Sequence, residues 1–134
     1  MDTVETATDW TRLGATRRGV EAALRDGLAD LDEVVLAFTH LSHVYPSGSS
    51  IYTTYLFRTA EDPAETLRRW TVLKEAVSRV VVAHGATISH QHGVGLDHRA
   101  YLEAEKGPLG IDLIRRLTSA VDPSGMLNPG KLVG

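Results

Sequence analysis

The feature that most restricts the fold is a pair of β-prone segments joined by a very short turn. Residues 33–44 (EVVLAFTHLSHV) and 51–59 (IYTTYLFRT) are rich in apolar, β-branched and aromatic side chains, a composition typical of strands. Only the turn-forming residues 46–50 (PSGSS) intervene after Tyr45. So short a link predicts that the two strands form an antiparallel hairpin.

Helical patterns surround this hairpin. Apolar residues recur at helical spacing in four segments, which are residues 11–30, 63–83, 99–106 and 109–121. Asp62 and Pro63 stand where an N-cap and a first helical residue are expected, and His84-Gly85 is a suitable end for that helix. The stripe expected to face the core from residues 63–83 includes Leu67 and Val77, and that from residues 109–121 includes Leu113 and Leu117.

Two further segments look extended. Residues 3–8 alternate in the manner of a strand, almost from the start of the chain, and residues 86–92 (ATISHQH) end at a Gly-Val-Gly break. The element order β-α-β-β-α-β-α-α predicts an α+β fold in which helices pack on an antiparallel sheet, in a ferredoxin-like plan. Because a domain seldom begins within a strand, we expect the chain to be cut from a longer polypeptide.

Composition excludes several function classes. A net charge of −3 without a basic stripe argues against a nucleic-acid partner, and the absence of cysteine excludes disulfides and thiolate metal sites. No apolar run approaches the roughly 18 residues that span a bilayer. We therefore expect a soluble, cytoplasmic protein.

The segment 89–95 (SHQHGVG) holds the densest group of candidate functional residues. In an extended segment His90 and His92 project to one face while Gln91 points to the other. The pair suits proton transfer or the binding of an anionic or planar ligand, because the following glycines permit close backbone approach. Metal ligation and a purely structural role are the alternatives that spacing leaves open.

The hairpin and the tail add weaker candidates. Alternation puts Tyr52 on the face opposite Ile51, and it puts His40 and His43 on opposite faces of their strand. A tyrosine hydroxyl that points into a cavity can act as a general acid or base, although most strand tyrosines only pack. Residues 122–132 (DPSGMLNPGKL) form a rigid, turn-rich path that either follows a ligand or simply ends the domain.

Taken together, these segments carry a family resemblance. The motifs occur in order along the chain, as HVYPSG at 43–48, IY at 51–52, SHQHGVG at 89–95 and NPGK at 128–131. The chain resembles the C-terminal region of the FAD-linked oxidases, most closely the alkyldihydroxyacetonephosphate synthase (alkylglycerone-phosphate synthase) branch, over essentially its whole length. The resemblance implies that residues 1–134 form a cap domain that covers the flavin ring and shapes the substrate site. FAD would be held mainly by an N-terminal FAD-binding domain, absent here, so this domain alone is expected to be inactive.

The resemblance also implies roles for individual residues. Tyr52 matches an acid/base tyrosine, and His90 and His92 match the outer members of an active-site histidine run. Gln91 stands at the middle position, where glutamine forms hydrogen bonds but cannot shuttle a proton near pH 7. Asn128 and Lys131, with Gln91, are expected to contact the cofactor.

The same resemblance bears on metals, partners and substrates. Some relatives bind a metal through hairpin and His-Gly positions, but Ser50 and Gln91 occupy two of these, so we expect no metal. The implied partners are a small-molecule substrate and the FAD-binding domain. The resemblance leaves open whether the protein forms a homodimer. It also leaves open contact with a membrane surface, if the substrate is an ether-lipid precursor. The alternative functions are a free-standing α+β module that binds a small ligand and a metal hydrolase built on the histidines.

Overall fold

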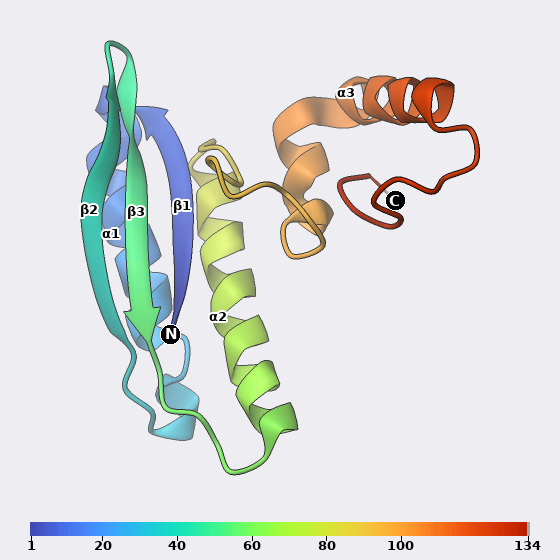
Figure 1. The fold of residues 1–134 in the computed structure, drawn as a ribbon. Coiled ribbons are helices and arrows are strands. Elements are labelled where there is room, and N and C mark those ends of the chain that lie inside the picture. The colour runs from blue at the N-terminus through green and yellow to red at the C-terminus, as the bar shows by residue number, and fades with distance from the viewer. Residues whose placement is uncertain (134) are drawn as a thin grey trace.

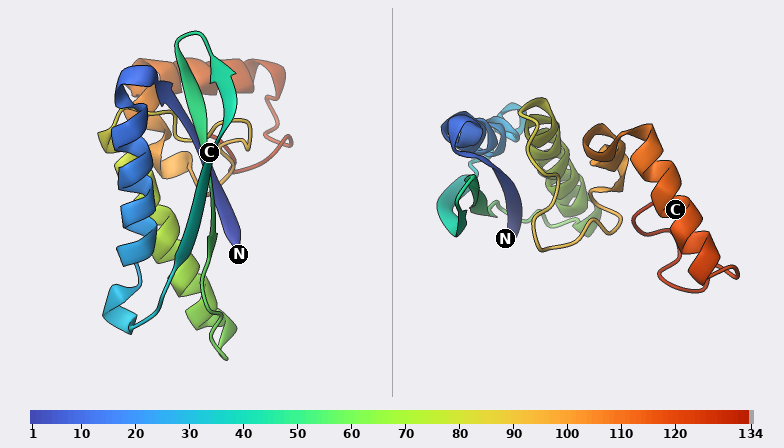
Figure 2. Two further views of the ribbon diagram at one scale, coloured as in Figure 1. Left: turned by 90° about the vertical axis from the view of Figure 1, so that its left-hand side faces the viewer. Right: turned by 90° about the horizontal axis from the view of Figure 1, so that it is seen from above.

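The structure is a computed structural model that describes residues 1–133. Its strands and helices follow the chain in the order β1 (Asp2–Asp9), α1 (Trp10–Asp26), η1 (a 3₁₀ turn, Ala29–Leu31), β2 (Leu36–Tyr45), β3 (Gly48–Leu56), α2 (Pro63–Ala83) and α3 (Arg99–Val121). The strands form an antiparallel sheet in the order β1-β3-β2 (Figure 1). Seen from above, α1 and α2 lie on one side of this sheet (Figure 2). The predicted α+β class and the hairpin are confirmed.

The predicted strand at residues 86–92 is wrong, although the segment runs where a fourth strand would. The Thr87 amide donates to the Ala7 carbonyl (3.0 Å), and the His90 amide donates to the Glu5 carbonyl (3.0 Å). The segment therefore follows the free edge of β1, the position of the last strand in a ferredoxin-like plan. Regular strand pairing cannot continue through Gln91, because its backbone adopts a left-handed conformation with φ 59°.

The two faces of the sheet differ in what covers them. Val4 and its partner Thr53 are buried against the helices, on what we call the helix face. The next residue along β3, Tyr52, pairs with Glu5 of β1 on one side and with His40 of β2 on the other. The side chains of these three residues point away from the helices, to what we call the open face. The buried hydrophobic residues from the helices are Val20, Leu24, Leu73, Val77, Val81, Leu102 and Ile111, and Leu28 joins them from the turn after α1.

Some predicted apolar stripes do not face the core. Leu67 is 60% exposed, and in α3 the side chains of Leu113 and Leu117 are exposed as well. The helix α3 is bent at Gly107, whose φ of 70° separates two helical halves, and the break predicted before Pro108 is thereby confirmed. Among residues 1–133, no helix is both long enough and apolar enough to cross a membrane.

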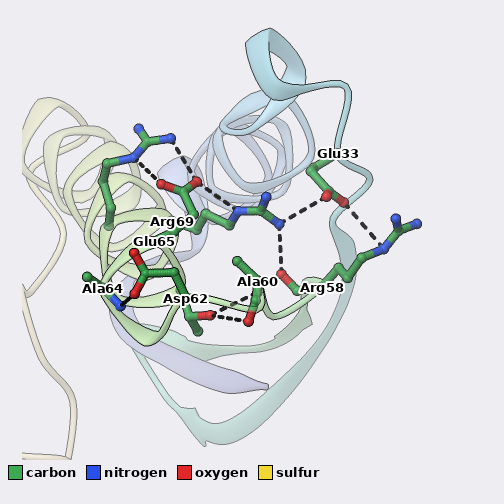
Figure 3. Close-up of polar contacts among 9 residues, drawn as sticks. Glu33, Arg58, Ala60, Asp62, Ala64, Glu65 and Arg69 are labelled. Atoms are coloured by element: carbon green, nitrogen blue, oxygen red, sulfur yellow. Dashed lines mark hydrogen bonds and ion pairs between the residues drawn. The ribbon is translucent and has the colours of Figure 1, made fainter.

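An ionic network fastens the start of α2 to the hairpin (Figure 3). Asp62 caps α2 by accepting a hydrogen bond from the Ala64 amide, as predicted for an N-cap. About two turns later, the Arg69 guanidinium donates hydrogen bonds to Glu65, to Glu33 just before β2 and to the Arg58 carbonyl just after β3. The largely buried Arg69 thus joins three segments at one end of the domain.

A second cluster of polar side chains, centred on Asp2, links β1 to α2. The Asp2 carboxylate accepts hydrogen bonds from the Tyr55 hydroxyl (2.9 Å), the Trp70 indole (2.7 Å) and the Lys74 ammonium group (2.9 Å). Burial acts to raise the pKa of Asp2, but the hydrogen bonds from Lys74 and the other donors outweigh it, so the pKa falls from 3.8 to about 2. Burial, followed by the charge of Asp2, raises the pKa of the Tyr55 hydroxyl.

The Asp2 carboxylate should make stability depend on pH in the acid range. Because its pKa is lower in the folded chain, its stabilising contribution is complete above about pH 4 and is lost as the pH falls toward about 2. The side chain is 29% exposed, so solvent screening reduces the expected contribution to about 1 kcal/mol. Urea titrations of wild type and Asp2→Asn at pH 7 and pH 2 measure it: the difference in unfolding free energy should shrink at the lower pH. An equal difference at both values would contradict this role.

Candidate active site

A β-bulge changes which hairpin residues reach the open face. Leu41 pairs with Ile51, but Val44 pairs with Ser49, so β2 carries one extra residue between these pairs. The prediction that His40 and His43 lie on opposite faces is therefore wrong, because the extra residue turns His43 back to the side of His40. Ser50 Oγ accepts a hydrogen bond from the His43 amide (2.9 Å), which fixes the bulged backbone.

The centre of the site is Glu5, which our sequence analysis did not include among the functional residues. Its side chain is only 2% exposed, and its carboxylate faces three imidazoles. The Oε1 atom lies 3.1 Å from His90 Nδ1 and 3.9 Å from His43 Nε2, and the Oε2 atom lies 3.3 Å from His92 Nε2. We call these four residues the Glu5 cluster. A buried carboxylate without a Lys or Arg partner in the described chain is costly unless such polar contacts compensate for the lost water.

Local backbone geometry brings the two loop histidines together. The His92 amide donates to the His90 carbonyl (2.8 Å) across Gln91, so the chain turns tightly between them. Both rings consequently reach Glu5, while Gln91 is exposed. The predicted shared direction of His90 and His92 is present, but a tight turn produces it instead of strand alternation.

His90 is held from both ring nitrogens. Its Nδ1 faces Glu5, and its Nε2 lies 3.0 Å from the Tyr45 hydroxyl. A neutral imidazole that donates from Nδ1 to the carboxylate presents Nε2 as an acceptor for the tyrosine. The series Tyr45, His90, Glu5 and His92 therefore forms a connected path of groups that can hold or pass a proton.

Tyr52 adjoins the other side of the cluster. Its ring stacks on His40 with centroids 5.2 Å apart, and it meets the edge of His92 at 5.4 Å with an angle of 80° between the planes. Tyr52, His90 and His92 thus lie together on the open face, whereas spacing alone had left a purely structural role open for each. A phenol beside an imidazole at a partly exposed surface is suited to acid/base chemistry on a molecule bound above it.

The predicted cofactor residues are not gathered at one place. Asn128 and Lys131 line a hollow of about 580 Å³ between the tail and the second half of α3, with Arg115 on its wall. Figure 1 places this tail beside α3 and away from the sheet. Gln91, in contrast, adjoins the Glu5 cluster.

The sequence model described as "FAD linked oxidases, C-terminal domain" matches residues 1–132. The chain belongs to the FAD-linked oxidases. This FAD-linked oxidase domain has the α+β fold that its motifs predicted, and the resemblance to the family is confirmed over the whole chain.

Individual relatives are similar over nearly the full length of this domain. The alkyldihydroxyacetonephosphate synthase of Trypanosoma brucei brucei is 26% identical over 132 residues, which are 98% of this chain and 21% of that protein. The D-2-hydroxyglutarate dehydrogenase of Stutzerimonas stutzeri is 27% identical over 132 residues, covering 96% of this chain and 28% of that protein. A solved alkyldihydroxyacetonephosphate synthase structure superposes with a TM-score of 0.61 at 20% identity, over 98% of this chain and 20% of that one, and shows the shared fold. The chain thus spans between 20% and 28% of the length of these relatives.

Membership of the family implies that the full-length protein uses FAD, and the described residues are suited to contact only one part of the FAD molecule. Within residues 1–133, the Gly93-Val94-Gly95 segment follows the histidines and does not lead directly into the first turn of a helix, so it is no pyrophosphate loop. The open face instead presents flat rings, those of His40, Tyr52 and His92, next to polar nitrogens. This face suits contact with a planar ring system but not the binding of a whole dinucleotide.

Proposed function

We propose that this domain covers the flavin ring and completes the substrate site of an FAD-dependent oxidoreductase or alkylglycerone-phosphate synthase-like transferase. The FAD would be held mainly by an N-terminal FAD-binding domain of the full-length protein. The observation that carries the proposal is the meeting of Tyr52, His90 and His92 around buried Glu5, on the sheet face that α1 and α2 leave free.

The surroundings of the site support a covering role. Leu36 (53% exposed) and Phe38 (60% exposed) lie on the open face in the same strand as His40. Apolar side chains that are this exposed, next to a polar cluster, are typical of a surface that another part of the protein covers. We propose that the FAD-binding domain packs against this face, so that Tyr52 lies over the flavin and the substrate between them.

In this arrangement each residue has a distinct task. FAD, when bound, supplies the redox or carbon-centred chemistry at its ring, and the protein manages the proton of the substrate. Tyr52 would exchange that proton through its hydroxyl, with His92 beside it as the next proton acceptor. Glu5 would orient the imidazoles of His90 and His92 and offset the positive charge that either gains on protonation.

Similarity to known enzymes suggests two substrate classes for the full-length protein. Similarity to alkyldihydroxyacetonephosphate synthase favours exchange of an acyl for an alkyl group on an ether-lipid precursor, which a membrane surface would supply. Gln91 stands where that branch is expected to carry a middle histidine, and a D-2-hydroxyglutarate dehydrogenase is equally similar over the chain. These two observations favour oxidation of a small 2-hydroxy acid as the second candidate.

The absorbance spectrum of the purified full-length gene product tests the proposal. We expect the visible bands of bound flavin in the full-length protein, and we expect residues 1–134 alone to retain no flavin once unbound FAD is removed. Anaerobic addition of a 2-hydroxy acid that bleaches the flavin would identify a dehydrogenase, and alkyl transfer from a long-chain alcohol without bleaching would identify a synthase. A full-length protein that binds no flavin would refute the proposal.

A further inference from the structure

We propose that Glu5, His90 and Tyr45 form a path that carries the substrate's proton from the active site to solvent at the tip of the hairpin. The inference rests on the proposed function, because it concerns the proton that Tyr52 and His92 receive from the substrate. Once the FAD-binding domain covers the open face, bulk water is excluded from Tyr52 and His92, and the proton needs another way out.

Neighbouring atoms along the whole path lie at or near hydrogen-bond distance. His92 Nε2 lies 3.3 Å from Glu5 Oε2, and Glu5 Oε1 lies 3.1 Å from His90 Nδ1. On the other side of the imidazole ring, His90 Nε2 lies 3.0 Å from the Tyr45 hydroxyl oxygen. A proton can therefore move from His92 to Tyr45 by transfers between neighbouring groups alone.

Exposure increases along the path toward the hairpin tip. The side chain of Glu5 is 2% exposed and that of His90 is 15% exposed, whereas Tyr45 is 41% exposed. Tyr45 ends β2, and the turn after it projects beyond the other elements at one end of the sheet (Figure 1 and Figure 2). Leu36 and Phe38, the proposed contacts of the FAD-binding domain, lie at the opposite end of β2. The Tyr45 end of the strand therefore stays open to solvent.

Hydrogen bonds from the start of α1 hold the hairpin tip in place. The Trp10 indole donates to the Pro46 carbonyl (3.1 Å), and the Trp10 amide donates to the Ser47 carbonyl (3.2 Å). Both acceptors belong to the turn that directly follows Tyr45. The position of the Tyr45 hydroxyl next to His90 is thus fixed by the fold, as a proton path requires.

Each transfer along the path moves one proton and no electron. His92, once protonated, gives its Nε2 proton to Glu5 and becomes neutral again. The Glu5 carboxyl group then turns and donates to His90 Nδ1, while the Nε2–H group of His90 passes its own proton to the Tyr45 oxygen. The Tyr45 hydroxyl releases its earlier proton to water or to a buffer base, so the net result is the release of one proton.

Substitutions of Tyr45 in the full-length enzyme test the path. Tyr45→Phe keeps the ring but removes the hydroxyl, and it should lower kcat by about 10²-fold, the lower end of what a positioned proton-transfer group contributes. Tyr45→Ala should show a similar loss, but added imidazole should restore its kcat in proportion to concentration, because this small base fits the space vacated beside His90. Val44→Ala is the matched control, since Val44 is 68% exposed in the same strand and has no place on the path. Its kcat should stay within about twofold of wild type.

Three results would each overturn the path. The first is a kcat of Tyr45→Phe within about twofold of wild type. The second is a loss in Tyr45→Ala that imidazole does not relieve, because such a loss indicates a structural role. The third is equal rescue by imidazole when Tyr45→Ala is combined with Glu5→Gln, since the amide cannot pass a proton from His92 to His90. If the double variant binds no flavin, the rescue of Tyr45→Ala alone decides.

The flavin spectrum separates failure of the path from failure of the proposed function. A wild-type protein without bound flavin refutes the proposed function, and the path with it. A wild-type protein that binds flavin and turns over, together with any of the three results above, refutes the path alone.

Discussion

Replacing Tyr52 by phenylalanine in the full-length enzyme is expected to lower turnover by about 10²- to 10⁴-fold, the usual contribution of a positioned acid or base. The change removes one hydroxyl and keeps the ring, so the stacking on His40 and the edge contact with His92 persist. The flavin spectrum should therefore remain that of wild type. Steady-state turnover with whichever substrate reduces or loads the flavin is the measurement.

Two other tyrosines make this experiment sharper. Tyr101 in α3 is partly buried next to the core and outside the site, so Tyr101→Phe should leave turnover nearly unchanged. Tyr45 is a rival, because its hydroxyl lies 3.0 Å from His90 Nε2. Near-normal turnover in Tyr52→Phe together with a large loss in Tyr45→Phe would assign the proton transfer to Tyr45 and contradict our assignment.

Gly48→Ala should lower the free energy of unfolding by about 3 kcal/mol. Gly48 begins β3 and pairs with Asp9 at the end of β1. A Cβ atom there would overlap the carbonyl oxygen of Thr8, which is backbone and cannot move aside like a flexible side chain. Relief of the overlap would require β1 and β3 to separate.

Urea denaturation followed by circular dichroism measures this effect. The matched control is Gly14→Ala in α1, where the new Cβ meets only the end of the Arg18 side chain at an ordinary 3.5 Å. Gly14→Ala should raise the free energy of unfolding by about 0.5–1 kcal/mol, since alanine is a better helix former than glycine. Equal unfolding free energies for Gly48→Ala and wild type would show that the strand pairing at this point is looser than the structure has it.

Much of the fold was predictable because local physics determines it. The bounds of α2 follow from the Asp62 cap, Pro63 and the His84-Gly85 ending, and the hairpin follows from a turn too short for any other connection. The errors arose where position in the fold matters. Leu67 has the right spacing for a core stripe but is exposed, because helical periodicity cannot say how far a neighbouring element extends.

The candidate site was predictable only in part. Tyr52, His90 and His92 could be found because their residue types stand out next to turns and glycines, and because the ordered motifs resemble a family. Residues 5–10 (ETATDW) also fit the family, but Glu5 was not predicted to be functional, since a single glutamate in an alternating strand usually points to solvent. His43 was assigned to the wrong face because one extra residue in β2 reverses the alternation, and a bulge of this kind has no reliable sequence mark.

The amino-acid sequence by itself determined the helices, the hairpin and the family, because caps, turns and residue spacing act between neighbours in the chain. Tertiary structure alone decided that Glu5 lies among His43, His90 and His92, because strand register and the path of the loop after α2 bring together residues up to 87 positions apart. A buried carboxylate surrounded by imidazoles is a property of that packing, and only the folded chain creates it.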